Sequence, residues 1–530
     1  MHRSSKKSSK SFRSPAASGS SSMAAGAPQG TVGRPRLGQY PKLIARFFEP
    51  LILLHVLGAT RGDHTPIPHN PKSPEFSRRR LLDNLAYLCD FDKGGPTTTA
   101  LGLEERHDCF KFWIASNRPT TKTLKFMSNA IESLKALFNA TPIKREEAIE
   151  EFTEACIAFA KTRIIKEAKL LYRAIAVCSD HLSKETDSAS LGLVTWLQMF
   201  VERDNITLCR WTYGHRNDEE MVQVNKRSRN VHETPAQSRV AADFATLRHR
   251  FGRLAHHVRA VKEVIVDAST LQHLFDECQI GQVPTLISVS RPEADAHTTL
   301  EGIMNRMLSS TNAIMLAKYV ESLAEMDQKF EILERVKEQY ASETFKPCVH
   351  AEIQVLEHFY QQGLAYAEGD PYIGCSKPAC YCCSLYIENH PAGCVVPQTH
   401  RNIYLNWGPP VLHDGTADEG YPTQRDILNA MLKVIRKEVF NQVSSKANAL
   451  KRHHDSITGL TQSTLSISTR VENSVDVETS FQRLDLGDLN GEPRAVQDNT
   501  SQSTPSSGNS FASSINDTPN HPYPFKEQTA

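Results

Sequence analysis

The spacing of apolar residues predicts that much of the first half of the chain is helical. Apolar side chains recur every three to five positions from Ile149 to Cys178, and again from Val240 to Ile265. This spacing places them along one face of a helix. Thr234-Pro235 precede the second stripe and supply a helix N-cap and a first-turn proline. We therefore expect residues 39–279 to form a mostly helical domain, through which protein partners can bind.

The second predicted helix also carries basic side chains away from its apolar stripe. Two interpretations are open: a basic ridge that binds RNA or DNA, or a helix face in contact with solvent. Charged runs on helices are usually solvated, so the second interpretation is favoured. The residues concerned are Arg248, His249, Arg253, His256 and Arg259.

The pattern changes after Gln279. A short apolar, β-branched run at 281–291 (GQVPTLISVSR) predicts a strand, as do Tyr372-Ile373 and the segment NIYLNW at 402–407. Amphipathic helices are expected between and after these segments, including one over 427–440. Strands that alternate with helices indicate an α/β domain, which we place at residues 280–445.

Both ends of the chain are predicted to be disordered. Residues 1–38 are rich in Ser, Gly, Ala and basic residues, and the first 48 residues hold nine Lys or Arg and no acid. Residues 446–530 are dominated by Ser, Thr and other polar residues. Neither composition offers enough apolar surface to form a core.

Charge and hydropathy narrow the class of protein. The formal net charge of +1 excludes the strongly basic field that drives nonspecific nucleic-acid binding. The start of the chain has no hydrophobic signal sequence, and the apolar run at 51–59 has about half the length of a membrane span. We expect an intracellular protein, cytoplasmic or nuclear, with no membrane partner. In that reducing compartment, clustered cysteines indicate metal binding or catalysis rather than disulfides.

Four of the twelve cysteines form such a cluster, and a second group of polar residues precedes it. Upstream, His350 opens a predicted helix that has Glu352 in its first turn. If a helix also starts at Cys380, the thiols of Cys380 and Cys383 lie on one face at its N-terminus, where the helix dipole favours thiolates. One imidazole and two thiolates are the protein ligands of a catalytic zinc site with one open position, and a nearby carboxylate can carry protons. The clustered cysteines are Cys375, Cys380, Cys382 and Cys383.

The residues alone leave other interpretations open. A Cys-x-x-Cys redox pair is one, although it leaves His350 and Glu352 without a role. A structural zinc site needs a fourth protein ligand, for which the candidates are Cys375, Cys382 and Cys348. The pair Cys375 and Cys380 is an alternative pair of metal ligands.

His-x-Glu followed by Cys-x-x-Cys resembles the zinc-dependent nucleobase deaminases of the cytidine-deaminase-like superfamily. The form HAE followed by GCSKPACYCC is most similar to the Orientia-prototyped deaminase-like family, which is expanded in fungi and related to bacterial toxin deaminases. The resemblance covers mainly residues 345–410, with weaker support over 280–445. In one departure, Ala379 stands where the superfamily usually has Pro.

The resemblance implies a fold, a cofactor and an activity. The fold is a mixed sheet flanked by helices, with NIYLNW as the strand after the cysteine helix. The cofactor is Zn²⁺, held by His350, Cys380 and Cys383, with Glu352 as the catalytic proton carrier. The activity is hydrolytic deamination of a nucleobase in a nucleotide or nucleic acid. A catalytically silent, zinc-stabilised scaffold is the alternative.

Two further residues are candidates for a substrate pocket. Trp407 can stack on a base, although a position in the core fits a tryptophan there better. Lys377 can contact a substrate phosphate or be solvated.

Overall fold

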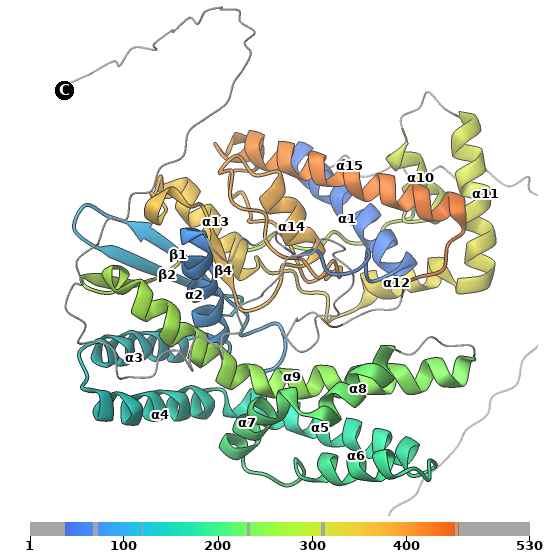
Figure 1. The fold of residues 1–530 in the computed structure, drawn as a ribbon. Coiled ribbons are helices and arrows are strands. Elements are labelled where there is room, and N and C mark those ends of the chain that lie inside the picture. The colour runs from blue at the N-terminus through green and yellow to red at the C-terminus, as the bar shows by residue number, and fades with distance from the viewer. Residues whose placement is uncertain are drawn as a thin grey trace, which may run out of the picture. The chain divides into compact units, whose positions relative to one another are not determined.

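The computed structural model describes residues 38–66, 73–118, 120–229, 234–308, 313–450 and 454. Nearly all of the two tails expected to be disordered, 1–38 and 446–530, lies outside these residues. The expected fold class is confirmed: the structure is an α/β protein with a small mixed sheet flanked by helices and a helix-rich N-terminal region (Figure 1). Within the described residues, no helix is long and apolar enough to cross a membrane.

The sheet has four strands in the order β3-β2-β1-β4. The hairpin of β1 (Thr99–Glu105) and β2 (Phe110–Ser116) forms its centre, and β1 also pairs antiparallel with β4 (Ile373–Cys375). At the other edge, β3 (Cys278–Gln282) pairs parallel with β2. The sheet therefore joins segments that lie far apart in the sequence.

Three of the four strands differ from the expected positions. The hairpin lies inside the region predicted to be helical, where the aromatic-rich run FKFWIAS forms β2. The strand expected at 281–291 is wrong beyond Gln282, since within 283–291 only Ser288 forms an isolated bridge, to Pro410. The strand at Tyr372-Ile373 is confirmed in β4.

The strand expected at NIYLNW is also wrong. Only isolated bridges occur there, Asn402 with Thr60 and Trp407 with Cys348. The backbone of this segment bonds to several separate partners rather than to one strand: Ile403 N–H donates to Ala59, and Asn406 accepts from Cys348 N–H. A turn over Leu405 and Asn406, closed by the hydrogen bond from Trp407 N–H to the Tyr404 carbonyl, ends the extended backbone.

Helices cover both faces of the sheet. On β1, Ala100 belongs to the core that contains α13, while Leu101 and Leu103 belong to the core that contains α2. Gly102 permits the close approach of α13, because a Cβ there would lie 2.7 Å from Val355 Cγ1 and closer still to the Phe359 ring. The helices that supply most of these two cores are α1 (Gln39–Leu57), α2 (Pro74–Cys89), α3 (Thr121–Phe138), α9 (Pro235–Thr270), α10 (Leu300–Met307), α11 (Ala313–Phe330), α12 (Ile332–Ala341), α13 (Ala351–Gln362), α14 (Tyr381–Glu388) and α15 (Tyr421–Ser445).

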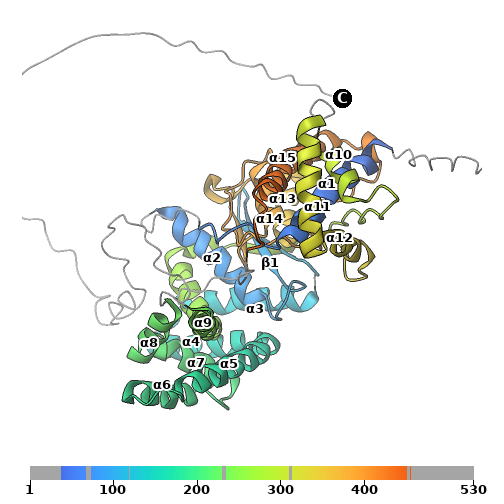
Figure 2. The same ribbon diagram turned by 90° about the vertical axis from the view of Figure 1, so that its right-hand side faces the viewer.

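A third core lies among the remaining helices, which gather around α9 (Figure 2). The capping box at Thr234 and Gln237 confirms the predicted start of α9. The apolar stripe at 149–178 belongs to two helices rather than one, with a break at Ala160. These helices are α4 (Pro142–Phe159), α5 (Lys161–Leu182), α6 (Ser188–Gln198), α7 (Asn205–Gly214) and α8 (Glu219–Arg229).

The prediction that the basic residues of α9 face solvent is wrong for most of them. Arg248, His249 and Arg253 are buried, and Arg259 forms an ion pair with Glu263. The reason is that α9 contacts α2, α5, α7 and α8, so its polar residues are covered by other helices.

The helix α1 contains the apolar run near the start of the chain. Leu51 to Leu54 have no exposed surface, and α1 packs against α15. The core that holds α13 and α14 therefore takes elements from both sides of residue 279.

Candidate active site

The first half of the site is the N-terminus of α13. His350 is the N-cap, with extended backbone angles, and the helix proper begins at Ala351. The side chain of Asn117, which follows β2, accepts a hydrogen bond of 2.7 Å from the Ala351 N–H. The amide of Gln354 donates to the carbonyl oxygens of Val349 and Ser116. The helix end that carries His350 is thereby held against the end of β2.

The second half is the N-terminus of α14. The predicted start of this helix is confirmed, because Cys380 is the N-cap and its sulfur accepts from the Cys383 N–H at 3.4 Å. The preceding loop is tied to β1: Ser376 N–H donates to the Thr99 carbonyl at 2.9 Å, and Thr99 N–H donates to Ser376 Oγ at 3.1 Å. Both helix N-termini are thus anchored to the central hairpin.

These anchors bring three potential metal ligands together. Nδ1 of His350 lies 3.3 Å from Cys383 Sγ and 3.6 Å from Cys380 Sγ. The ligand atoms of the three residues all lie within 4.8 Å of one another, and in the described part of the chain no other group of three or more such residues does this. Both cysteines are buried, and the imidazole is partly exposed.

The electrostatics of this group favour one thiolate. Burial raises the pKa of Cys380, but a hydrogen bond from Cys383 and the charge of His350 outweigh it and lower that pKa to about 6. Burial lowers the pKa of His350, but the charge of Cys380 outweighs this and holds the pKa well above its usual value. Burial raises the pKa of the Cys383 thiol. The thiolate is the form of cysteine that binds metals.

Glu352 lies in the first turn of α13, beside this group. Its side chain is 5% exposed, and its Oε2 atom is buried without a hydrogen-bond partner among the described residues. Its negative charge adds to burial in raising the pKa of the Cys383 thiol. A buried acceptor without a partner costs free energy, and this one lies beside the three potential metal ligands.

The other cysteines of the motif lie outside the group. Cys375 is the last residue of β4, and its N–H donates to Asp83 Oδ1 at 3.0 Å. Cys382 is fully buried in the core. Cys348 helps to raise the pKa of the His350 ring but is not one of the three grouped ligands.

The two candidate pocket residues are engaged elsewhere. The ammonium of Lys377 contacts the buried carboxylate of Asp90 at 3.5 Å, and donates to Thr98 Oγ1 at 3.0 Å and to the Gly94 carbonyl. Trp407 has no exposed surface, and its ring lies 5.7 Å from that of Phe47 in the core. The structure thus places Lys377 in an ion pair and Trp407 in the core.

Sequence reasoning missed several residues that position the site. Asn117 and Ser376 hold the two helix starts, and Asp83 accepts from the Tyr372 hydroxyl at 2.8 Å as well as from the β4 backbone. Burial raises the pKa of Asp83 to about 7. A signal for Asn117 was present, because β-branched and aromatic residues end there in Asn-Arg-Pro, a pattern typical of a strand followed by a turn.

A mixed sheet, two helix N-termini that present His350 and the Cys-x-x-Cys pair, and a buried acid beside them form the candidate site. Residues 349–411 match the family model of the OTT_1508-like deaminases. The match confirms the resemblance to the Orientia-prototyped family over this segment and supports a deaminase-type function. No curated protein and no solved structure matches the chain.

Proposed function

We propose that the chain is a zinc-dependent hydrolytic deaminase that acts on a nucleobase in a nucleotide or nucleic acid. The observation that carries this proposal is the position of Glu352, a buried carboxylate with an unpartnered oxygen next to a His-Cys-Cys group. A structural zinc site needs a fourth protein ligand and has no use for this acid.

The residues present fit zinc. Zn²⁺ prefers thiolate and imidazole ligands, and catalytic sites use three protein ligands with one position left open. His350, Cys380 and Cys383 would hold the ion, and no fourth ligand joins them among the residues that the structure describes. When bound, zinc supplies Lewis acidity that makes water a nucleophile near neutral pH.

Glu352 would move the protons of the reaction. Its carboxylate takes a proton from the attacking water, whose oxygen forms a bond to the ring carbon that carries the amino group. The protonated carboxyl passes this proton to the ring nitrogen beside that carbon, and the carboxylate then moves the remaining hydroxyl proton to the amine nitrogen. The C–N bond breaks, and ammonia leaves as the ring carbonyl forms. Proton transfer by a positioned carboxylate contributes about 10²–10⁴-fold to such reactions.

The test compares the wild type with Glu352→Gln. Ammonia release from purified protein is measured with nucleobases, nucleosides, nucleotides and nucleic acid. RNA and DNA from cells that express each variant are sequenced for C-to-T and A-to-G changes. We expect turnover by the wild type and about 10²–10⁴-fold less by Glu352→Gln at unchanged zinc content. Glu388→Gln, at the exposed end of α14, is the matched control and should retain activity.

Metal content tests the ligand set separately. Cys380→Ser and Cys383→Ser should each lower the zinc bound per chain, measured by atomic absorption, whereas Cys382→Ala should not. Full zinc binding by Cys380→Ser would remove that residue from the set. Zinc binding without turnover on any substrate would favour the alternative, a catalytically silent scaffold.

A further inference from the structure

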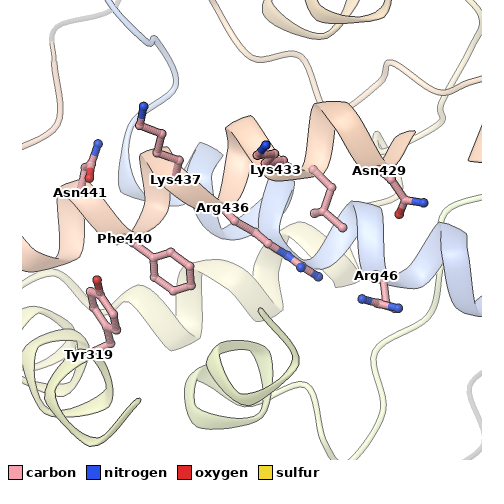
Figure 3. A pocket seen from close by; sticks show the side chains of 9 residues that line it. Arg46, Tyr319, Asn429, Lys433, Arg436, Lys437, Phe440 and Asn441 are labelled. Atoms are coloured by element: carbon pink, nitrogen blue, oxygen red, sulfur yellow. The ribbon is translucent and has the colours of Figure 1, made fainter. Parts of the chain in front are cut away.

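A basic groove lies between α1, α11 and α15, on a part of the molecule that the deaminase motif does not use. It encloses about 560 Å³. Figure 3 shows its cationic side chains, which come from two helices, and an aromatic pair at one end. No acidic residue lines it. The cations are Arg46 of α1 and Lys433, Arg436 and Lys437 of α15.

The positions of these cations follow from the periodicity of α15. Residues 433, 436, 437 and 440 are separated by three or four positions and therefore share one face of the helix. The opposite face carries the apolar residues that pack into the core, among them Leu428, Ile435 and Val439. The groove face is thus the side of α15 that the fold does not need for its core.

The positive charge in the groove is not compensated. Arg46, Lys433 and Lys437 form no ion pair with any described residue. Arg436 donates only a 3.4 Å hydrogen bond to the Arg306 carbonyl, and its Nε is buried without a described partner. Burial, and then the charge of Arg46, lower the pKa of Arg436. Like charges held close together repel, and a bound anion would relieve that repulsion.

An aromatic pair lies beyond the cations. The rings of Tyr319 and Phe440 have centroids 4.7 Å apart and an interplanar angle of 33°, and both side chains are partly exposed. The residues from Lys433 to Phe440 span about 10 Å along α15, which is longer than one phosphate group. Cations followed by aromatic faces are the combination that binds single-stranded nucleic acid, because phosphates pair with the cations and bases stack on the rings.

We propose that this groove binds single-stranded nucleic acid. Arg46, Lys433, Arg436 and Lys437 contact the phosphates, and a base stacks on Tyr319 and Phe440. The inference goes beyond the proposed deaminase activity and does not depend on it. An acidic peptide would satisfy the cations but has no planar bases for the aromatic pair, and a lipid surface would leave that pair unused.

The test measures binding of labelled, mixed-sequence RNA and DNA strands of about 20 nucleotides to the full chain by fluorescence anisotropy, over about 50–200 mM salt. The variant Arg46→Ala/Lys433→Ala/Lys437→Ala removes three exposed cations. The matched control Lys144→Ala/Lys161→Ala/Lys169→Ala removes the same charge from exposed positions on α4 and α5. Thermal unfolding checks that each variant folds.

We expect the groove variant to bind at least about tenfold more weakly than wild type, with a salt slope about 2 smaller, while the control changes little. Phe440→Leu should weaken binding about fivefold or more by loss of stacking. Equal losses in the two triple variants, or no binding by the wild type, would overturn the proposal. So would tighter binding to phosphatidylserine vesicles or poly-glutamate than to the oligonucleotides. The binding measurements require no turnover, so failure of the deaminase proposal can be told apart from failure of this one.

Discussion

Two buried groups of polar residues in this molecule differ in how they are partnered. In the helical region, Glu167 is 1% exposed and lies 3.0 Å from the Lys93 ammonium and 3.7 Å from the guanidinium groups of Arg250 and Arg253. Next to the His-Cys-Cys group, Glu352 is buried to a similar degree but forms no ion pair with a described Lys or Arg, and the cation beside it is the His350 ring. Both acids lie on helices, so the local sequence does not distinguish them.

The difference in neighbouring cations distinguishes a buried acid that stabilises the fold from one that does not. The negative charge of a buried carboxylate surrounded by cations is compensated, and removing the carboxylate leaves those cations buried without a counter-ion. Oε2 of Glu167 and Oε2 of Glu352 both lack a hydrogen-bond partner among the described residues, but the Glu167 oxygen lies 3.7 Å from the Arg250 guanidinium. A buried carboxylate oxygen with neither a hydrogen bond nor a Lys or Arg beside it costs stability and persists only where another role requires it. The Glu167 group is accordingly structural, whereas Glu352 fits a site.

The largest effect is expected from exchanging these two acids for their amides. Glu167→Gln should lower the free energy of unfolding by about 3–5 kcal/mol, because it leaves several buried cations without their counter-ion. Glu352→Gln should lower it by much less, because the charge that Glu352 faces, on the His350 ring, keeps Cys380 as its partner, although turnover falls. Urea unfolding of the two variants measures this contrast. Equal destabilisation would show that Glu352 is also a structural acid.

Lys377 connects the two regions, since it extends from the cysteine loop to Asp90, which also pairs with Arg163 at 3.5 Å. Lys377→Ala should cost about 1–3 kcal/mol, because Asp90 keeps one cation but loses the other. Lys166→Ala breaks a more exposed pair with Asp92 and should cost less than about 1 kcal/mol. If Lys377 instead contacts substrate, its replacement would raise KM without affecting unfolding.

The raised pKa of Asp83 predicts that the free energy of unfolding depends on pH. Burial raises its pKa from 3.8 to about 7 in the folded chain. Between these values the folded state holds a proton that the unfolded state releases, so this contribution to stability falls as the pH rises towards 7. Asp83→Asn does not titrate. The stability of the wild type relative to this variant should therefore fall by about 2–3 kcal/mol from about pH 5 to pH 8, as measured by urea unfolding at each pH. A pH-independent difference would contradict the raised pKa.

The smallest effect is expected at Asn117. Asn117→Ala removes the acceptor for the Ala351 N–H at the start of α13 and should cost about 1 kcal/mol. Zinc affinity should fall as well, because the hydrogen bond between Ala351 N–H and Asn117 fixes the helix end that carries His350. Asn139→Ala, whose exposed side chain makes only a 3.5 Å bond to Lys135, is the control. Zinc titration and thermal unfolding separate the two effects, and unchanged zinc affinity would mean that Asn117 acts on stability alone.

The predictions from sequence were best where neighbours within one helical turn decide the outcome. The start of α9 at the Thr234 cap and the start of α14 at Cys380 are confirmed. The hairpin was missed because its two short strands lie among helical stripes, and because the partner of β1 at the sheet edge is β4, far along the chain. The strand expected at NIYLNW failed because a turn interrupts that segment.

By itself, the sequence determined the chemistry available at the site: an imidazole, a carboxylate and clustered thiols, placed at predicted helix starts. Those features depend on residue type and on close neighbours in the chain. Only the tertiary structure decided that Cys380 and Cys383, and not Cys375, face His350, and that one oxygen of Glu352 has no described partner. It also decided that the basic residues of α9 are mostly buried, whereas those of α1 and α15 meet in one groove. Burial and charge compensation arise from contacts between distant segments, which no local pattern specifies.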